Sequence, residues 1–250
     1  MRNRLDKLLL AQGLAPSRER AQALILAGRV LVDQQKVEKP GANVEETAIL
    51  RVLGEEQRYV SRGGLKLEAA LTRWQIDLRG RHCADIGTST GGFTDCMLQH
   101  GAASVIAVDT GYGQIAEALR RDPRVSLRER TNARYLRPGD LGSQITFVSM
   151  DVSFISATLV LPAVLAAVRE SPGTALEAVI LVKPQFEAGR EQVGKGGIVL
   201  DPAAHQLAID RVRAALHDLG ASRIELADSP ILGGGGAAKG NREFLLYGCF

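Results

Sequence analysis

Strand-like apolar runs alternate with helical segments from residue 61 onward, and this rhythm limits the folds that are open to the chain. The spacing of apolar residues predicts helices over 61–74, 92–100, 115–121, 155–169 and 202–219. The strands predicted between them span 82–86, 104–109, 125–129, 145–150 and 178–183. Strands separated by helices form βαβ units, which build a parallel sheet covered by helices on both faces. We therefore expect a doubly wound α/β domain over residues 61–250.

The last two predicted strands, 223–227 and 244–249, depart from that rhythm. No amphipathic helix separates them, and the glycine run 233–236 joins them. We expect these two strands to pair antiparallel. A parallel sheet that ends in this way resembles the Rossmann-like S-adenosylmethionine methyltransferases more than the nicotinamide dehydrogenases. That resemblance implies a mostly parallel, seven-stranded sheet that ends in an antiparallel hairpin.

A glycine-rich loop follows the strand 82–86 and leads into the helix 92–100. Glycines at such a place let the backbone approach a ligand, and the helix N-terminus offers free N–H donors. The pattern is G-x-x-x-G-G and not G-x-G-x-x-G, which argues against a dinucleotide. Taken alone, the loop could still be an ordinary turn between a strand and a helix. The residues expected to contact a cofactor here are Asp85, Gly87, Ser89, Thr90, Gly91, Gly92 and Phe93.

Two further polar residues indicate which cofactor the loop would hold. Asp109 ends the next strand, 18 residues after Gly91, where a carboxylate can accept hydrogen bonds from both hydroxyls of an adenosine ribose. Asn132, beyond the third strand, is expected at the adenine edge, and Asp85 at the positively charged methionine end. The combination favours S-adenosylmethionine as the cofactor.

The overall composition is that of an ordinary globular protein, with 45% hydrophobic and 24% charged residues in a chain of 250. The net charge of +3 is too small to indicate a nucleic-acid partner by itself. Three cysteines without a C-x-x-C motif and four histidines without ligand spacing predict a reduced, cytoplasmic protein that holds no metal. The sequence shows neither a signal peptide nor a run of roughly 18 apolar residues, so we expect neither secretion nor membrane insertion.

Residues 1–58 form a second, smaller predicted domain of the α+β class, which a polar linker at about 54–60 joins to the first. Ser17 is placed to cap the second helix of this domain, and Gly28 is placed to end it. Helices are expected over 5–9 and 21–25, and strands over 29–33 and 48–52.

Positive charge is concentrated in the first 30 residues, which carry six arginine or lysine residues and two acidic ones, a net charge of +4. Together with the apolar spacing, the segments Arg4-Leu-Asp-Lys-Leu-Leu and Gly28-Arg-Val-Leu-Val-Asp resemble the RNA-binding domain first described in ribosomal protein S4. The resemblance covers the whole unit and implies that its second helix and neighbouring basic residues face RNA. Any single arginine of this set could equally well solvate a helix face. The positions expected at the RNA are Arg4, Arg18, Arg20 and Arg29.

Four polar residues stand at the ends of predicted elements, where a sheet of this kind places its site. Methylation of a ribose hydroxyl needs a group that removes the hydroxyl proton, and a lysine does this only when it is neutral. The lysine pKa of about 10.4 falls when the side chain is desolvated or when another cation is near. Two lysines framed by carboxylates therefore make a suitable base and positioning set, although the sequence alone does not show that they converge. The four residues are Lys66, Asp151, Lys183 and Glu243.

The order Lys, Asp, Lys, Glu resembles the tetrad of the FtsJ-type RNA 2′-O-methyltransferases. With the S4-type domain in front, and with Lys183-Pro-Gln-Phe-Glu-Ala-Gly and Gly194-Lys-Gly-Gly present, the whole chain resembles the TlyA family. That family comprises bacterial enzymes, also named haemolysins, that methylate the ribose 2′-hydroxyl of cytidines in 16S and/or 23S ribosomal RNA. The resemblance implies that Lys183 is the general base, that Asp151 lies beside the methyl group, and that Lys66 and Glu243 steer the ribose.

The same resemblance implies ribosomal RNA or a ribosomal subunit as the partner, with no DNA, and a monomer or weak dimer. Further phosphate contacts are expected from Arg62, Arg190 and Lys195. Two alternatives stay open, an RNA-binding assembly factor with a vestigial cofactor pocket and a membrane-active haemolysin. The lack of a signal, a spanning segment and a strongly apolar amphipathic helix argues against the haemolysin.

Overall fold

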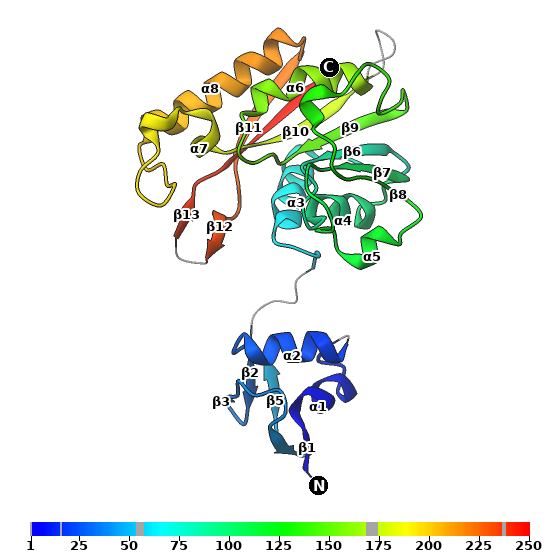
Figure 1. The fold of residues 1–250 in the computed structure, drawn as a ribbon, viewed down its shortest axis with the longest axis vertical. Coiled ribbons are helices and arrows are strands. Elements are labelled where there is room, and N and C mark those ends of the chain that lie inside the picture. Colours follow the sequence, from blue (N-terminus) through cyan, green and yellow to red (C-terminus); the bar gives the residue numbers. More distant parts are fainter. Residues whose placement is uncertain (1, 16, 54–57, 169–174, 237–238) are drawn as a thin grey trace. The chain divides into compact units, whose positions relative to one another are not determined.

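The chain consists of two compact units in the computed structural model, Met1–Arg58 and Tyr59–Phe250 (Figure 1). The structure describes residues 2–15, 17–53, 58–168, 175–236 and 239–250. The division between the units falls inside the predicted linker, of which residues 54–57 lie outside the described part. None of the helices in the described residues is long and apolar enough to cross a membrane.

Two helices and two small sheets make up the first unit. Its elements are β1 (Arg2–Arg4), α1 (Leu5–Ala11), α2 (Arg18–Leu26), β2 (Val30–Val32), β3 (Gln35–Lys36), β4 (Asn43–Glu45) and β5 (Leu50–Val52). Strands β3, β2 and β5 form one antiparallel sheet, and β1 pairs with β4. The hydroxyl of Ser17 accepts a hydrogen bond from the Arg20 N–H at 3.2 Å, so the predicted cap of α2 is confirmed. The β1–β4 pair was not predicted, because its exposed polar residues carry no apolar alternation.

A buried carboxylate holds the start of this unit together. Asp6 in α1 is fully buried and accepts hydrogen bonds from Arg4 at 2.9 and 3.0 Å, from Arg18 at 3.0 Å and from Gln22 at 2.8 Å. The hydrogen bonds from Arg4, followed by those from Gln22 and Arg18, hold the Asp6 pKa well below its ordinary value even though burial opposes this shift. Asp6 therefore joins α1 to α2 in its charged form.

Seven strands form the sheet of the second unit, in the order β11-β14-β10-β9-β6-β7-β8. These strands are β6 (His82–Ile86), β7 (Ser104–Val108), β8 (Val125–Arg128), β9 (Ile145–Met150), β10 (Glu177–Val182), β11 (Arg223–Asp228) and β14 (Phe244–Cys249). The helices of the unit are α3 (Gly63–Trp74), α4 (Gly92–Gln99), α5 (Glu117–Arg120), α6 (Leu161–Val168), α7 (Pro184–Glu187) and α8 (Pro202–Asp218). Single 3₁₀ turns span Ala133–Tyr135, Ala157–Leu159 and Arg190–Gln192.

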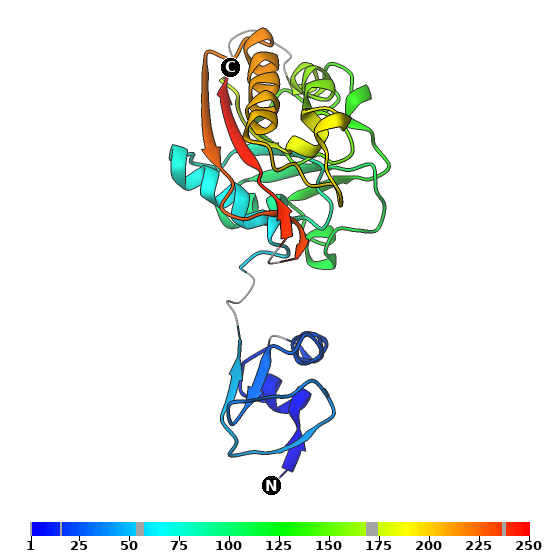
Figure 2. The same cartoon turned by 90° about the vertical axis from the view of Figure 1, so that its left-hand side faces the viewer.

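Alternate residues of each strand enter two separate cores, one on each face of the sheet. Ile86, Val148 and Ile180 pack with α6 and α8 on one face. Phe147 and Val179 pack with α3 and α4 on the other face. Figures 1 and 2 show the helices on both sides of the twisted sheet. The predicted doubly wound α/β class is confirmed.

The strand β14 lies between β10 and β11 and runs antiparallel to both. The antiparallel pairing of the last two predicted strands is therefore confirmed. Between them, the glycine run forms the strand β12 (Gly233–Gly236), which pairs with β13 (Lys239–Asn241). The predicted helix 155–169 is divided into a 3₁₀ turn and α6, and its last residue lies outside the described part.

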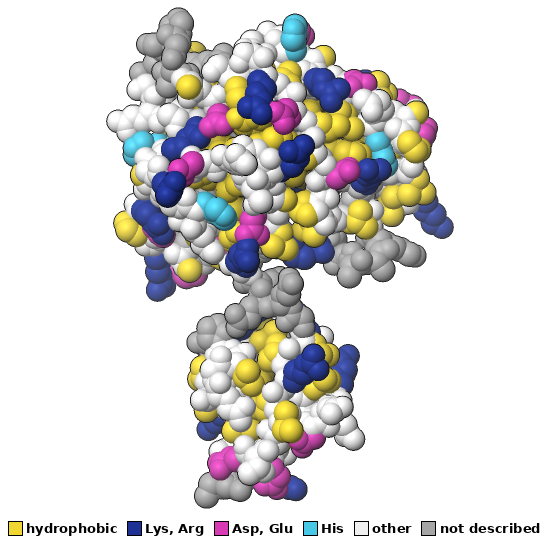
Figure 3. Space-filling view, turned by 180° about the vertical axis from the view of Figure 1, so that it is seen from behind, with side chains coloured by type: hydrophobic (Ala, Val, Ile, Leu, Met, Phe, Trp, Pro, Cys, Tyr) yellow, Lys and Arg dark blue, Asp and Glu magenta, His cyan; other side chains and the backbone are white. Residues whose placement is uncertain are grey.

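Charges are mixed on one face of the second unit. On the face in Figure 3, basic and acidic side chains are interspersed among apolar ones. This mixture agrees with a net charge of only +3 for the chain. This face therefore carries no patch of a single charge sign that would mark a functional site, and the carboxyl edge of the sheet is the place to look for one.

Replacing Asp6 by Asn is expected to lower the free energy of unfolding of the first unit near neutral pH by about 1–3 kcal/mol, because two arginines lose the buried carboxylate that they bind. The folded-state pKa of Asp6 lies below its unfolded value, so this stabilisation is present above about pH 4 and is lost as the pH falls. Hydrogen exchange of the α1 and α2 amides in the full chain at pH 7 and pH 2 measures the difference. As a matched control, Glu45→Gln removes the exposed pair with Arg2 and should change exchange little. Equal effects of the two substitutions at pH 7 would contradict the assignment.

Candidate active site

Three glycines bring the loop after β6 into close contact with its surroundings. Gly87 has a φ of +87°, and a Cβ at this position would overlap the carbonyl oxygen of Asp151. A Cβ at Gly92 would lie 2.9 Å from the Gly64 nitrogen and would overlap the Ser61 hydroxyl. Gly91 has a φ of +97°, a backbone conformation that other residues rarely adopt. The loop therefore packs closely between the end of β9 and the start of α3.

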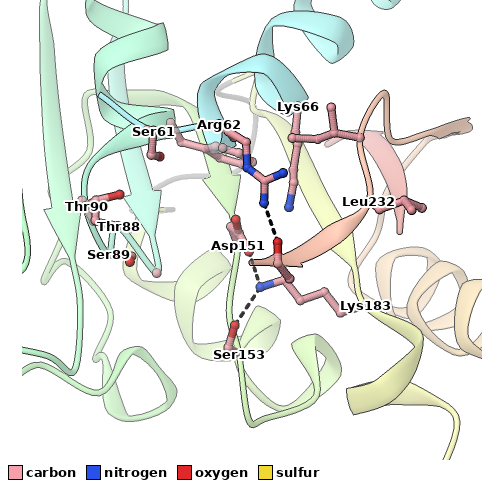
Figure 4. Close-up of a pocket in the computed structure, with 16 residues that line it drawn as sticks. Ser61, Arg62, Lys66, Thr88, Ser89, Thr90, Asp151, Ser153, Lys183 and Leu232 are labelled. Atoms are coloured by element: carbon pink, nitrogen blue, oxygen red, sulfur yellow. Dashed lines mark hydrogen bonds and ion pairs between the residues drawn. The ribbon is translucent and has the colours of Figure 1, made fainter. Parts of the chain in front are cut away.

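Two adjoining cavities of about 280 and 310 Å³ open at this edge of the sheet. Both are lined by Gly87, Ser89, Asp151 and Ser153. The first, which we call the lysine pocket, is completed by Ser61, Arg62, Gly63, Lys66, Thr88, Thr90, Gly92, Phe93, Lys183, Ile231, Leu232 and Gly234 (Figure 4). The second, which we call the Asp109 pocket, is completed by Ile86, Val108, Asp109, Thr110, Gly111, Gln114, Asn132, Ala133, Val152, Phe154, Ile155 and Val160.

The carboxylate of Asp109 is held by the backbone on both of its oxygens. One oxygen accepts the Ser89 N–H at 2.7 Å, and the other accepts the Gly111 N–H at 2.6 Å. The side chain is half-buried at the wall of the pocket. Asn132 lines the same pocket, where its side-chain oxygen also accepts the Arg134 N–H at 3.1 Å. The structure therefore brings these two predicted cofactor residues together.

Asp85 requires a correction, because its side chain points into the core and lines neither pocket. It is fully buried and accepts hydrogen bonds from Thr94 at 2.6 Å and from Ser149 at 3.1 Å. Burial raises the pKa of Asp85 from 3.8 to about 7, although both hydroxyls oppose that shift. The predicted contact with a methionine end is therefore replaced by a contact that joins α4 to β9.

Two lysine–carboxylate pairs lie at the lysine pocket. Lys183, which follows β10, has its Nζ 2.5 Å from Asp151 and donates a hydrogen bond to Ser153 at 2.7 Å (Figure 4). Lys66 in α3 donates a hydrogen bond to Glu243 at 2.6 Å. Glu243 is buried behind Lys66 and is not part of the pocket wall. The four residues of the predicted tetrad thus converge from four different elements.

Residues predicted to contact RNA lie at several different places. Arg62 lines the lysine pocket and donates a hydrogen bond to the Gly234 carbonyl of β12. Arg190 and Lys195 are exposed, and the described residues that line the two pockets include neither of them. In the first unit, Arg4 and Arg18 bind Asp6, and their side chains are 43% and 44% exposed. Arg20 is half-buried, and Arg29 donates a hydrogen bond to the Leu53 carbonyl at 2.8 Å.

Ser153 and Phe154 are among the pocket-lining residues that the sequence analysis missed. Ser153 contacts the Lys183 ammonium, and Phe154 is 91% exposed with a φ of +64°. Such a backbone conformation is uncommon for a bulky residue and indicates functional constraint. The one available signal was the position of both residues directly after Asp151, at the carboxyl end of a predicted strand.

The order and direction of the seven strands define a Rossmann-like methyltransferase fold. Residues 59–249 match the FtsJ-like methyltransferase family, and residues 3–50 match the S4 domain. The chain therefore belongs to the FtsJ-like methyltransferases and carries an S4 domain at its amino-terminal side.

Similar proteins span nearly the whole chain. It is 47% identical to the "Putative rRNA methyltransferase YqxC" of Bacillus subtilis (strain 168), over 98% of this chain and 85% of that protein. It is 43% identical to the "16S/23S rRNA (cytidine-2'-O)-methyltransferase TlyA" of Mycobacterium tuberculosis (strain ATCC 25618 / H37Rv), over 98% and 89% of the two chains. The solved structure of a "Putative hemolysin" from Streptococcus thermophilus is similar at a TM-score of 0.73 and 44% identity, and covers 99% of this chain and 88% of that one. The predicted resemblance to the TlyA family is confirmed.

Replacing Asp85 by Asn is expected to stabilise the protein at pH 8 by roughly 1–3 kcal/mol, because a buried charge is removed. The folded-state pKa of Asp85, about 7, lies above its unfolded value, so the wild-type protein loses stability as the pH rises from about 4 to 7. The variant lacks this loss, and the two proteins should converge in stability at pH 4. Urea unfolding at pH 4, 6 and 8 measures the difference. Parallel stability curves for the two proteins would show that Asp85 does not titrate in this range.

Proposed function

We propose that this protein transfers the methyl group of S-adenosylmethionine to the ribose 2′-hydroxyl of a cytidine in ribosomal RNA. The observation that carries the proposal is the lysine pocket, in which Lys183 meets Asp151 and Ser153 beside the Lys66–Glu243 pair. The acceptor follows from the names of the relatives, which are an rRNA methyltransferase and a 16S/23S rRNA cytidine-2′-O-methyltransferase.

The residues of the Asp109 pocket fit S-adenosylmethionine. The backbone N–H groups hold the Asp109 carboxylate at the pocket wall, where its remaining lone pairs can accept both ribose hydroxyls. The left-handed Gly87 leaves open the space beside Asp151 that a side chain would fill. A cavity of about 310 Å³ lies within the range of about 300–1,000 Å³ that is usual for small-molecule sites. The cofactor supplies a methyl group on a sulfonium, which is ready for in-line displacement.

Lys183 is the residue of this chain that we propose as the base. In its neutral form, its Nζ would receive the hydroxyl proton as the ribose oxygen bonds to the methyl carbon and displaces the sulfonium sulfur, which leaves as a neutral thioether. Asp151 at 2.5 Å and Ser153 at 2.7 Å fix the position of Nζ. Lys66, held by the buried Glu243, presents a cation to the same pocket and can orient the ribose by hydrogen bonding. The carboxylates thus set the geometry and Lys183 moves the proton.

Phe154 supports recognition of an unpaired base next to this site. Its ring is 91% exposed at the rim of the Asp109 pocket and contacts only one aromatic neighbour among the described residues, Phe186. Proteins read single-stranded or flipped-out RNA bases by stacking them on such aromatic rings. We infer that the cytidine base stacks on Phe154 while its ribose reaches the lysine pocket, and that the S4 domain binds a neighbouring RNA element.

Replacing Lys183 by Ala tests the proposed base. Single-turnover transfer of a labelled methyl group to ribosomal subunits should fall by roughly 10²–10⁴-fold, the usual contribution of a general base. Binding of S-adenosylmethionine by calorimetry should stay within about threefold, because Lys183 does not line the Asp109 pocket. Arg213→Ala, which removes an exposed cation of α8, serves as the control and should retain full transfer. Transfer that survives in Lys183→Ala would eliminate Lys183 as the base.

Replacing Phe154 by Gly tests base stacking without adding strain, because glycine favours the positive φ of this position. The KM for RNA should rise by roughly 5- to 150-fold, which corresponds to the 1–3 kcal/mol of one stacked base. Because glycine also removes the ring contact with Phe186, kcat and S-adenosylmethionine affinity are measured as well, and both should stay within about threefold of the wild type. Leu200→Gly, which removes another strongly exposed apolar side chain, is the control. An unchanged KM for RNA would exclude stacking on Phe154.

A further inference from the structure

Two segments that each carry half of the proposed catalytic pair are joined at three places. The first segment, 151–157, follows β9, and the second, 183–187, follows β10 and contains α7. At one end, Lys183 contacts Asp151 and Ser153 (Figure 4). In the middle, the rings of Phe154 and Phe186 lie 5.4 Å apart at 52°. These non-covalent contacts, at both ends and in the middle, make the two segments one structural unit.

The contact at the other end is formed by Glu187, and we call it the Glu187 clamp. One carboxylate oxygen of Glu187 accepts the Ser156 hydroxyl at 2.5 Å, and the other accepts the Ala157 N–H at 2.7 Å. The Glu187 carbonyl accepts a hydrogen bond from Arg211 in α8, which holds the end of α7 in place. The clamp therefore ties the first segment to α7 and, through α7, to α8.

Burying the Glu187 carboxylate for such a contact has a free-energy cost. It is almost completely buried, and desolvation raises its pKa above the ordinary value even though both hydrogen bonds and Arg211 oppose this. The 3₁₀ turn at Ala157–Leu159 already has a cap, since the Ser156 hydroxyl accepts the Thr158 N–H at 3.2 Å. Formation of that turn does not explain why a carboxylate is buried here.

The neighbouring backbone gives the reason. Phe154 stands two residues before Ser156 with a φ of +64°, and such a strained conformation persists only where surrounding contacts impose it. Lys183 precedes a helix of only four residues, which cannot fix its own position. The Glu187 clamp holds the far ends of both segments and so restrains Phe154 and Lys183 together.

We propose that Glu187 is a positioning residue for methyl transfer, because it fixes segment 151–157 against Lys183 and so aligns Asp151, Ser153 and Phe154. This inference rests on the proposed function and adds a residue that touches neither pocket. A displacement of about 1 Å at a reacting group can cost about 10²-fold in rate. The loss of the clamp should therefore lower kcat and not merely stability.

The test compares variants at the two ends of β10. Glu187→Ala removes the clamp but keeps the Ser156 cap of the 3₁₀ turn, whereas Ser156→Ala removes one hydrogen bond of the clamp together with that cap. Glu187→Gln keeps an acceptor for Ala157 and a donor for the Ser156 oxygen. Glu177→Ala is the matched control, because this carboxylate begins β10 and binds Arg81 and Tyr247 at the opposite edge of the sheet. Each full-length variant is assayed for kcat at saturating S-adenosylmethionine and ribosomal subunits, for melting temperature and for hydrogen exchange.

We expect kcat to fall roughly 10- to 100-fold in Glu187→Ala and roughly 3- to 10-fold in Ser156→Ala, with S-adenosylmethionine affinity within about threefold of the wild type. Glu187→Gln should restore at least half of the wild-type kcat. Glu177→Ala should melt at a lower temperature but keep its kcat. Amides 152–158 should exchange faster in Glu187→Ala and at the wild-type rate in Glu177→Ala.

A wild-type kcat in Ser156→Ala, or equal losses in Glu187→Gln and Glu187→Ala, would overturn the proposal. The same holds if Glu177→Ala loses as much kcat as Glu187→Ala. Should Glu187→Ala fail to fold, Ser156→Ala and Glu187→Gln decide. If the wild type itself does not label ribosomal subunits, the proposed function fails, whereas hydrogen exchange still shows whether the clamp restrains segment 151–157.

Discussion

The contact between the backbones of Gly87 and Asp151 is the constraint on which the site depends. With no side chain at residue 87, the glycine loop can lie directly on the end of β9. One consequence is that the two cavities share a wall, so a ligand bound by Asp109 and a group held by Lys183 would meet at Asp151. Any larger residue at this position would separate the part of the site that fits a cofactor from the part that fits a ribose.

The structure uses buried carboxylates in three different electrostatic settings. Asp6 is surrounded by arginines and stays charged, and its role is to order cations that remain partly open to solvent. Asp85 receives hydrogen bonds from neutral groups, the hydroxyls of Thr94 and Ser149 and the Thr94 backbone, so burial dominates and its pKa rises. Glu187 lies between these cases, because its hydrogen-bond donors are neutral but the charge of Arg211 also acts on it. The number and charge of the donors, and not burial alone, decide what each carboxylate does.

Much of the fold could be predicted because its signals are local. The strands His82–Ile86 and Ile145–Met150 agree with the prediction residue for residue, since each is a short, mostly apolar segment between predicted loops. The β1–β4 pair has no such run and was missed. The site was predictable only in part, because the convergence of Lys66 with Glu243, 177 residues apart, follows from the sheet order and not from spacing. The sequence also does not reveal that the Asp85 side chain turns inward or that Phe154 has a positive φ, since both depend on tertiary contacts.

The reversed direction of β14 has a practical consequence for anyone who attaches a probe to this protein. Because β14 runs against its neighbours, it begins beside Glu243 near the lysine pocket and ends at the opposite edge of the sheet. There, the backbone of Phe250 exchanges hydrogen bonds with that of Leu176, just before β10 begins. A fluorophore or affinity label placed at Phe250 would therefore lie on the side of the second unit that faces away from both pockets.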